Sequence, residues 1–122
     1  MGVCFSHGRA SWSCTGFNRF RSRLADLIGI SLDEIAGYGG NKTFEGEEDP
    51  IVPLLDHSDC DGDLSPEECA KIAPRLKEMI GILSKRAESG ESYEYEYDII
   101  VGMRLAEGMA EAAEKNERFV FL

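Results

Sequence analysis

The chain is organised around one stretch, LLDHSDCDGDLSPEE at residues 54–68. Four aspartates and two glutamates fall within thirteen residues, and Gly62 lies among them. Like charges at this density repel one another unless a cation or a set of backbone donors offsets the repulsion. An apolar run precedes the acids and a helix-forming sequence follows them, so this stretch joins two parts of the fold.

This stretch resembles the loop of an EF-hand, in which twelve residues surround a calcium ion and a glycine occupies the sixth position. With Gly62 in that position, the loop runs from His57 to Glu68. The resemblance implies a divalent-cation site, with calcium as the expected ion and these candidate ligands: His57, Asp59, Asp61, Asp63 through its carbonyl, Ser65 and Glu68. The departure is at the first position, where His57 replaces the usual aspartate. An imidazole is a poor ligand for a hard cation.

A metal-free interpretation of the same residues remains open. Ser65, Pro66 and Glu68 form a capping box with proline at the first helical position, so they are explained as the start of a helix. Asp61 and Asp63 near that helix N-terminus suit the helix dipole. Asp-Gly is also a common turn pair. In this interpretation the acidic residues make a capped turn without a bound ion.

Length and composition predict one domain spanning residues 1–122. A hydrophobic content of 43% argues against disorder. No run of eighteen apolar residues occurs, so we expect no membrane span. The four cysteines lack paired spacing and no secretory signal precedes them, which favours reduced thiols and a cytoplasmic location. None of their spacings is typical of a structural zinc site.

The formal charge of −10 is unevenly distributed. Residues 1–30 hold four arginines against Asp26 alone, whereas residues 45–98 hold sixteen acids against five bases. This asymmetry disfavours a nucleic-acid surface over most of the molecule, and it favours cations or basic protein partners.

Apolar periodicity predicts four principal helical segments, near residues 16–28, 31–37, 65–85 and 92–115. In the first, we place Arg19, Arg21 and Arg23 on a solvated face, opposite an apolar stripe of Phe17, Phe20, Leu24, Leu27 and Ile28. The apolar stripe of the third consists of Cys69, Ile72, Ala73, Leu76, Met79, Ile80 and Leu83. Ser31 and Glu34 form a capping box for the second segment.

Two features complicate the longer segments. Pro74 should kink the third or divide it after two turns. For the fourth, Ile99, Met103, Ala106, Ala110 and Ala113 recur at helical spacing. We extend this helix back with a stripe of Tyr93, Tyr97 and Ile100, although the alternation of tyrosine and glutamate there leaves a strand as the alternative.

The two termini are predicted to be short strands. Val3, Cys4 and Phe5 form one apolar run, and Phe119 to Phe121 form another. The sequence offers each only the other as a partner, so we expect them to pair antiparallel. The predicted fold class is therefore α+β and predominantly helical, with four or so helices packed on a pairing of N- and C-terminal strands.

Residues 24–38 resemble a helix-turn-helix, with Gly29 at the turn. The would-be recognition helix, from Ser31 to Tyr38, carries Asp33 and Glu34 but no arginine, lysine, asparagine or glutamine. It lacks the donors needed to read base edges or contact phosphates, so we interpret the segment as a helical corner. No nucleic acid is expected as a partner.

The whole chain is similar to a family of small proteins of actinobacteria and their phages. The matching features are His7-Gly8, Trp12-Ser13, the segment 16–21 and the turn from His57 to Gly62. This resemblance implies no activity. It does imply that His57 is a usual part of the turn, which weakens the calcium interpretation.

Three classes of function follow from these residues. The first is a small acidic cytosolic binding protein without catalytic activity, whose EF-hand-like loop takes calcium. The second is a phage or bacterial adaptor or inhibitor that engages a basic protein, with the loop purely structural. An enzyme is the third class and is not expected, because no nucleophile–base pair or complete metal triad can be placed; His7 beside serines has no acid partner in the sequence pattern.

Overall fold

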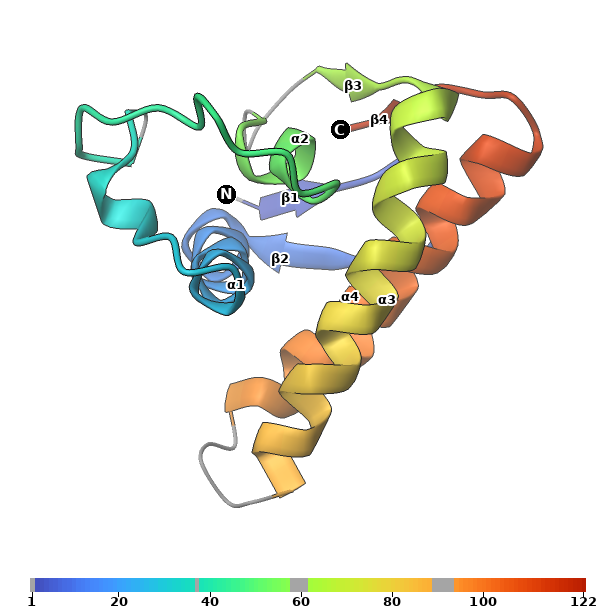
Figure 1. Ribbon diagram of the computed structural model, residues 1–122. Coiled ribbons are helices and arrows are strands. Elements are labelled where there is room, and N and C mark those ends of the chain that lie inside the picture. The colour runs from blue at the N-terminus through green and yellow to red at the C-terminus, as the bar shows by residue number, and fades with distance from the viewer. Residues whose placement is uncertain (1, 37, 58–61, 89–93) are drawn as a thin grey trace.

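A computed structural model describes residues 2–36, 38–57, 62–88 and 94–122. The elements follow in this order: β1 (Gly2–Cys4), β2 (Ser11–Ser13), α1 (Cys14–Leu27), the 3₁₀ turn η1 (Leu32–Glu34), α2 (Val52–Leu55), β3 (Asp63–Leu64), α3 (Pro66–Glu88), α4 (Glu94–Glu114) and β4 (Phe119–Val120). Within these ranges, four α-helices combine with two small antiparallel strand pairs (Figure 1). The predicted helical α+β class is confirmed.

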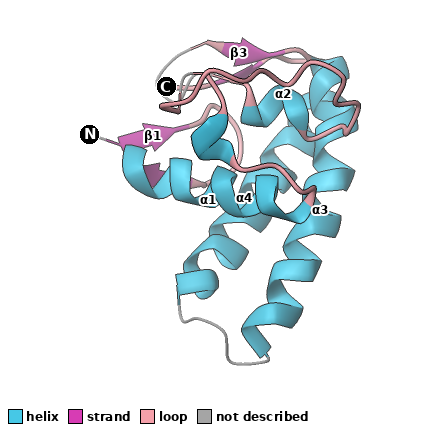
Figure 2. Ribbon diagram, turned by 60° about the vertical axis from the view of Figure 1, so that its left-hand side comes forward, coloured by secondary structure: helices cyan, strands magenta, loops and turns pink. Residues whose placement is uncertain are grey.

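The long helices α3 and α4 run side by side in opposite directions and form a hairpin (Figures 1 and 2). The end that includes Glu88 and Glu94 extends away from the rest of the molecule, whereas the other end lies beside α2, β3 and β4 (Figure 1). Pro74 lies inside α3 without dividing it, so that part of the prediction is wrong. Apolar side chains of α3 are buried on both sides of Pro74. The free energy that this burial contributes exceeds the cost of the one backbone hydrogen bond that proline removes.

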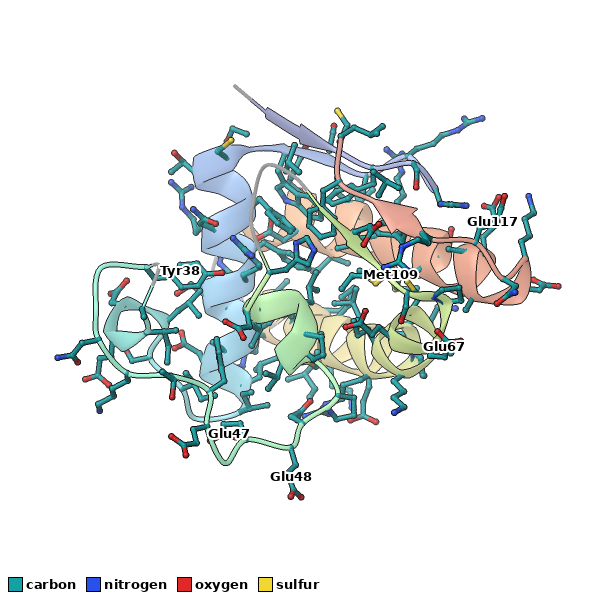
Figure 3. The ribbon with its side chains drawn as sticks, turned by 90° about the horizontal axis from the view of Figure 1, so that it is seen from above. Tyr38, Glu47, Glu48, Glu67, Met109 and Glu117 are labelled. Atoms are coloured by element: carbon teal, nitrogen blue, oxygen red, sulfur yellow. The ribbon has the colours of Figure 1, made fainter. Side chains whose placement is uncertain are left out.

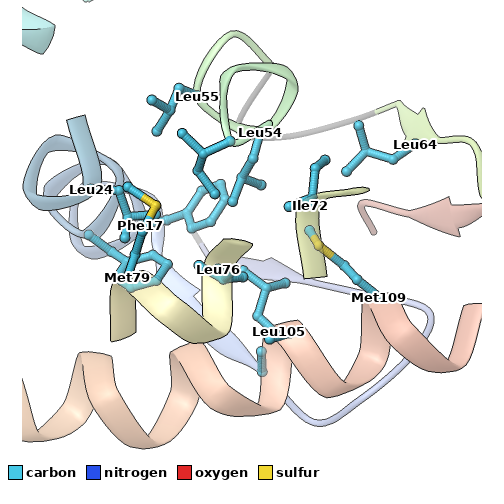
Figure 4. Close-up of a cluster of buried hydrophobic side chains, with 14 of the residues drawn as sticks. Phe17, Leu24, Leu54, Leu55, Leu64, Ile72, Leu76, Met79, Leu105 and Met109 are labelled. Atoms are coloured by element: carbon cyan, nitrogen blue, oxygen red, sulfur yellow. The ribbon is translucent and has the colours of Figure 1, made fainter. Parts of the chain in front are cut away.

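The core lies where α1, α2, β3 and the inner ends of the hairpin meet (Figure 4). Phe17 and Leu24 enter it from α1, and Leu54 enters it from α2. The predicted α3 stripe is confirmed, since all of its members are buried: Cys69, Ile72, Ala73, Leu76, Met79, Ile80 and Leu83. Burial of such side chains stabilises the fold by about 25 cal/mol for each Å² of apolar surface removed from water.

The termini meet as predicted, but each terminal strand also has a second partner. β1 pairs with β2, with Val3 opposite Trp12, and β4 pairs with β3, with Leu64 opposite Phe119. A single antiparallel bridge between Phe5 and Phe121 joins the two ends of the chain. The predicted contact of the termini is therefore confirmed, whereas the expectation that they had only each other as partners is wrong. The acidic stretch supplies the second strand for β4.

The predicted second helix is reduced to the single turn η1. Ser31 makes no side-chain capping bond there, so the expected capping box does not form. The backbone turns instead toward Lys42, whose amide donates to the Glu34 carbonyl at 2.8 Å. The glycine-rich sequence at 37–40 explains why no longer helix forms here, because glycine loses more conformational freedom in a helix than any other residue.

The inward face of α4 differs from the prediction only in its first turns. Ala106 is buried, and Ile99, Met103, Ala110 and Ala113 pack partly buried against the core. The described part of this segment is helical from Glu94, which excludes the strand alternative there. Tyr97 and Ile100 are exposed, however, while Asp98, Val101 and Leu105 are buried. Apolar residues occur around most of this helix, so periodicity alone did not fix its orientation. Tyr93 lies outside the described residues.

Candidate functional site

The acidic loop, residues 57–68, lies between α2 and α3 and is described at both ends. Its final part follows the pattern of an EF-hand loop, because β3 covers the seventh and eighth positions and α3 begins at the tenth. Gly62 at the sixth position has φ +91°, a left-handed conformation that favours glycine. A β-carbon there would lie 3.1 Å from His57 Cε1. The backbone conformation therefore favours glycine at this position, and a β-carbon would crowd the imidazole.

Ser65 and Glu68 form the predicted capping box. The Glu68 amide donates to Ser65 Oγ at 3.1 Å, and the Ser65 amide donates to Glu68 Oε1 at 2.9 Å. These two bonds satisfy donors that the first turn of α3 would otherwise leave without partners. One carboxylate oxygen of the expected bidentate ligand is therefore already engaged by the protein.

His57 spans the loop rather than facing outward. Its Nε2 lies 3.0 Å from the carbonyl oxygen of Asp63. Since a carbonyl can only accept, the imidazole carries its proton on Nε2 and donates it. In the EF-hand comparison, this carbonyl is the seventh-position ligand that faces the cation. The imidazole N–H thus satisfies the oxygen that a calcium ion would otherwise coordinate.

The imidazole is held in place by the C-terminal strand. Its ring stacks on Phe121, with 4.0 Å between ring centroids and an interplanar angle of 20°. The Phe121 amide also donates to the Gly62 carbonyl at 2.9 Å. These contacts link the first and sixth positions of the loop to one residue at the end of the chain.

The Asp63 side chain is occupied by an arginine. Arg118 donates from Nε to Oδ2 and from Nη2 to Oδ1, each at 2.8 Å, in a bidentate pair. The Arg118 guanidinium lowers the pKa of Asp63 through these hydrogen bonds. The pair lies on the surface, so solvent screens much of its energy.

Arg21 supplies a second cation at the start of the loop. It is 1% exposed, and its Nη1 donates to the carbonyls of Leu54 and His57. Its guanidinium also lies 4.5 Å from the centre of the Phe17 ring. The expectation of a solvated arginine face is wrong for Arg21, and also for Arg23, which is half-buried and paired with Asp98. Carbonyls at the end of a short helix attract cations, which explains why a charge on α1 is buried here.

Four of the six predicted ligand residues are described. The structure brings His57 to Asp63 and brings Ser65 to Glu68, while Asp59 and Asp61 lie outside the described residues. Within the described ranges, no three His, Cys, Asp or Glu side chains are gathered as metal ligands. The protein's own donors that reach the loop, from Arg21, Arg118 and Phe121, were not predicted. No local pattern marks them, because each lies far from the loop in sequence.

The sequence pattern gave His7 no acid partner, but the structure supplies one. His7 Nδ1 lies 2.7 Å from Ser6 Oγ, and its Nε2 lies 3.1 Å from Glu117 Oε1. Ser6 Oγ also accepts from the Val120 amide at 2.9 Å, and the Ser6 amide donates to the Val120 carbonyl. Ser6 and His7 near the start of the chain thus contact Glu117 and Val120 near its end. Because the serine oxygen accepts from the backbone of β4, these contacts join the two ends of the chain.

The described cysteines, Cys4, Cys14 and Cys69, are free thiols. Burial raises the pKa of Cys69 to about 11, with a further contribution from the Glu68 charge, so this thiol stays protonated near neutrality. Cys60 lies outside the described residues.

None of the helices in the described ranges has both the length and the apolar character needed to cross a lipid bilayer. No family model, curated protein or solved structure matches this chain.

Proposed function

We propose that this protein is a small acidic binding protein without catalytic activity, that its acidic loop is closed by His57 rather than by a cation, and that it engages a basic protein partner. The observation that carries this proposal is the 3.0 Å contact between His57 Nε2 and the Asp63 carbonyl. Glu68 Oε1, one of the two oxygens of the expected closing ligand, also accepts from the Ser65 amide, and the Asp63 carboxylate is paired with Arg118.

The charge distribution supports a basic partner. Residues 41–68 contain ten acids against Lys42 alone. Glu47 and Glu48 project outward from the segment that leads into α2, and Glu67 lies at the start of α3 (Figure 3). Glu45, Glu47, Glu48, Asp56 and Glu67 are exposed, and we refer to them as the acidic surface. Such a surface raises the rate of encounter with a positively charged molecule.

A calcium-binding function is the second candidate, and a specific observation favours it. The left-handed Gly62, the strand at the seventh and eighth positions and the helix start at the tenth follow the EF-hand pattern. In this candidate, calcium displaces the His57 hydrogen bond and uses Asp59, Asp61 and Glu68 as its carboxylate ligands. The two candidates therefore differ in what calcium does to the protein.

Thermal melting with calcium and with a chelator separates them. If His57 rather than a cation closes the loop, millimolar calcium leaves the wild-type melting temperature unchanged. The variant His57→Asp removes the imidazole donor and restores the usual first ligand, so calcium should stabilise this variant. A ligand that binds only the folded state adds about 2.7 kcal/mol at a hundredfold excess over its dissociation constant. A wild-type protein that is stabilised in this way would establish the calcium candidate instead.

The partner proposal needs its own measurement. Calorimetric titration with a lysine-rich peptide should give binding that weakens as salt rises, because exposed charges are screened within about 8–10 Å at ordinary ionic strength. The double variant Glu47→Gln/Glu48→Gln should weaken binding more than the matched pair Glu107→Gln/Glu114→Gln on α4, which removes the same charge elsewhere. Equal effects of the two pairs would contradict the acidic surface.

A further inference from the structure

A hollow of ≈ 380 Å³ opens between β2, α1 and α4, away from the acidic loop. Each element contributes two side chains to its walls: Trp12 and Ser13, Arg19 and Arg23, and Tyr97 and Asp98. Gly16 also lines it, and a β-carbon there would lie 2.9 Å from Ser13 Oγ and 3.6 Å from Trp12 Cδ1. A larger residue at position 16 would therefore press on one wall of the hollow.

The inner wall of the hollow is fixed by a buried polar group. Asp98 is 4% exposed, and its Oδ1 accepts from Trp12 Nε1 at 3.1 Å. Its other oxygen is paired with Arg23. A buried carboxylate of this kind needs such partners, and the partners in turn hold the indole and one guanidinium in fixed positions. The wall is thus organised before any ligand arrives.

Arg19 supplies a positive charge at the edge of the hollow. It lies one helical turn before Arg23 on the same face of α1. It is exposed, and no acidic side chain in the described ranges forms an ion pair with it, although Asp33 borders an adjoining hollow. A guanidinium presents a planar fork of donors that matches a carboxylate or a phosphate.

Ser13 and Tyr97 add a donor and an apolar surface. Ser13 Oγ accepts from the Gly16 amide at 3.0 Å as the cap of α1, and its own hydroxyl proton remains for donation. The Tyr97 side chain is 53% exposed, and its hydroxyl donates to the Ser11 carbonyl at 2.6 Å. This bond holds an aromatic ring at the opening of the hollow, where a flat apolar group can pack against it.

We propose that this hollow binds a small aryl anion. The carboxylate or phosphate lies on Arg19 and the Ser13 hydroxyl, and the ring packs against Tyr97. A pocket that combines an aromatic wall with a few fixed polar groups is the usual form of a small-molecule site. The proposal uses no residue of the acidic loop or the acidic surface, so it stands or fails independently of the proposed function.

Trp12 is the only tryptophan of the chain and lies in the wall, so its fluorescence reports on binding. Phenyl phosphate, benzoate and neutral benzyl alcohol are titrated into wild type, Arg19→Gln and the control Arg9→Gln, with amide NMR shifts as a second readout. We expect saturable binding of phenyl phosphate or benzoate, about tenfold weaker binding by Arg19→Gln and no change for Arg9→Gln. The tighter of the two anions identifies the phosphate or the carboxylate class.

Three results would overturn the proposal. The first is the absence of saturable changes with either anion in both readouts. The second is equal affinity of Arg19→Gln and wild type. The third is benzyl alcohol binding as tightly as the anions, which would leave only an apolar depression. Because Arg19 is exposed, loss of folding does not complicate the comparison.

Discussion

Asp63 in the acidic loop and Arg118 before the last strand form a bidentate ion pair with both nitrogen–oxygen distances at 2.8 Å. The two residues are 55 positions apart in sequence, and the pairing of β3 with β4 brings them together. The pair is a direct link between the most acidic part of the chain and its C-terminal end. It also makes the stability of this link depend on the charge of Asp63.

The first prediction is a loss of stability in acid. Hydrogen bonds from Arg75 lower the pKa of Asp49, and those from Arg118 lower the pKa of Asp63. Because both pKa values are lower in the folded chain, the stabilisation is present above the unfolded value of about 3.9 and is lost as the pH falls through the folded value. Urea unfolding between neutral and acid pH measures it.

Asp49→Asn should flatten this acid dependence, because it removes the carboxylate that accepts from Arg75 Nε and Nη2. Asp26→Asn is the matched control, since Asp26 is exposed and makes no ion pair within the described ranges. An unchanged pH profile in Asp49→Asn would contradict the role of this ion pair.

The second prediction concerns the capping box of α3. Glu68→Gln should cost little stability, with or without calcium, because glutamine can also accept from the Ser65 amide at the third helical position. Ser65→Ala should cost about 1 kcal/mol by removing the oxygen that caps the Glu68 amide. Thermal melting of both variants, each with calcium and with chelator, measures these effects. A calcium-dependent difference between wild type and Glu68→Gln would count against a purely structural loop.

The third prediction is that Arg21 is required for folding stability. Arg21→Met keeps much of the side-chain volume but leaves the Leu54 and His57 carbonyls without this donor in a buried place. We expect a loss of roughly 2–4 kcal/mol in the free energy of unfolding, measured by urea titration. Arg19→Gln on the same helix is the control and should lie within about 0.5 kcal/mol of wild type. Equal stability of the two variants would refute this role.

The fourth prediction tests the C-terminal strand. Phe121 is 3% exposed and contacts the rings of Phe5, Phe17 and His57. Phe121→Ala should cost about 3–5 kcal/mol, the usual effect of removing a buried phenylalanine ring. Leu122→Ala is the control next to it, because that side chain is 65% exposed. Chemical denaturation measures the free energy of unfolding of both variants. Similar losses in the two would show that the strand is not part of the core.

Much of the fold could be predicted from local pattern. The α1 and α3 stripes recur at helical spacing; the members of the α3 stripe are buried, as are Phe17, Phe20 and Leu24 of α1, whereas Leu27 and Ile28 are partly buried. The α4 face could not be predicted in this way, because Asp98 is buried through contacts with Trp12 and Arg23 that lie far away in sequence. The burial of Arg21 could not be predicted for the same reason, because its partners are backbone carbonyls of α2 and the loop.

In the acidic loop, the turn glycine and the capping box follow from the local sequence alone. Both depend on residues within a few positions of one another, whose conformational preferences act locally. The partners of the other loop groups depend on the folded arrangement, in which His57 donates to Asp63, Phe121 covers the imidazole, and Arg118 neutralises the carboxylate. The contacts of Phe121 and Arg118 join segments more than fifty residues apart, and they exist only once burial of the core has brought β4 beside β3.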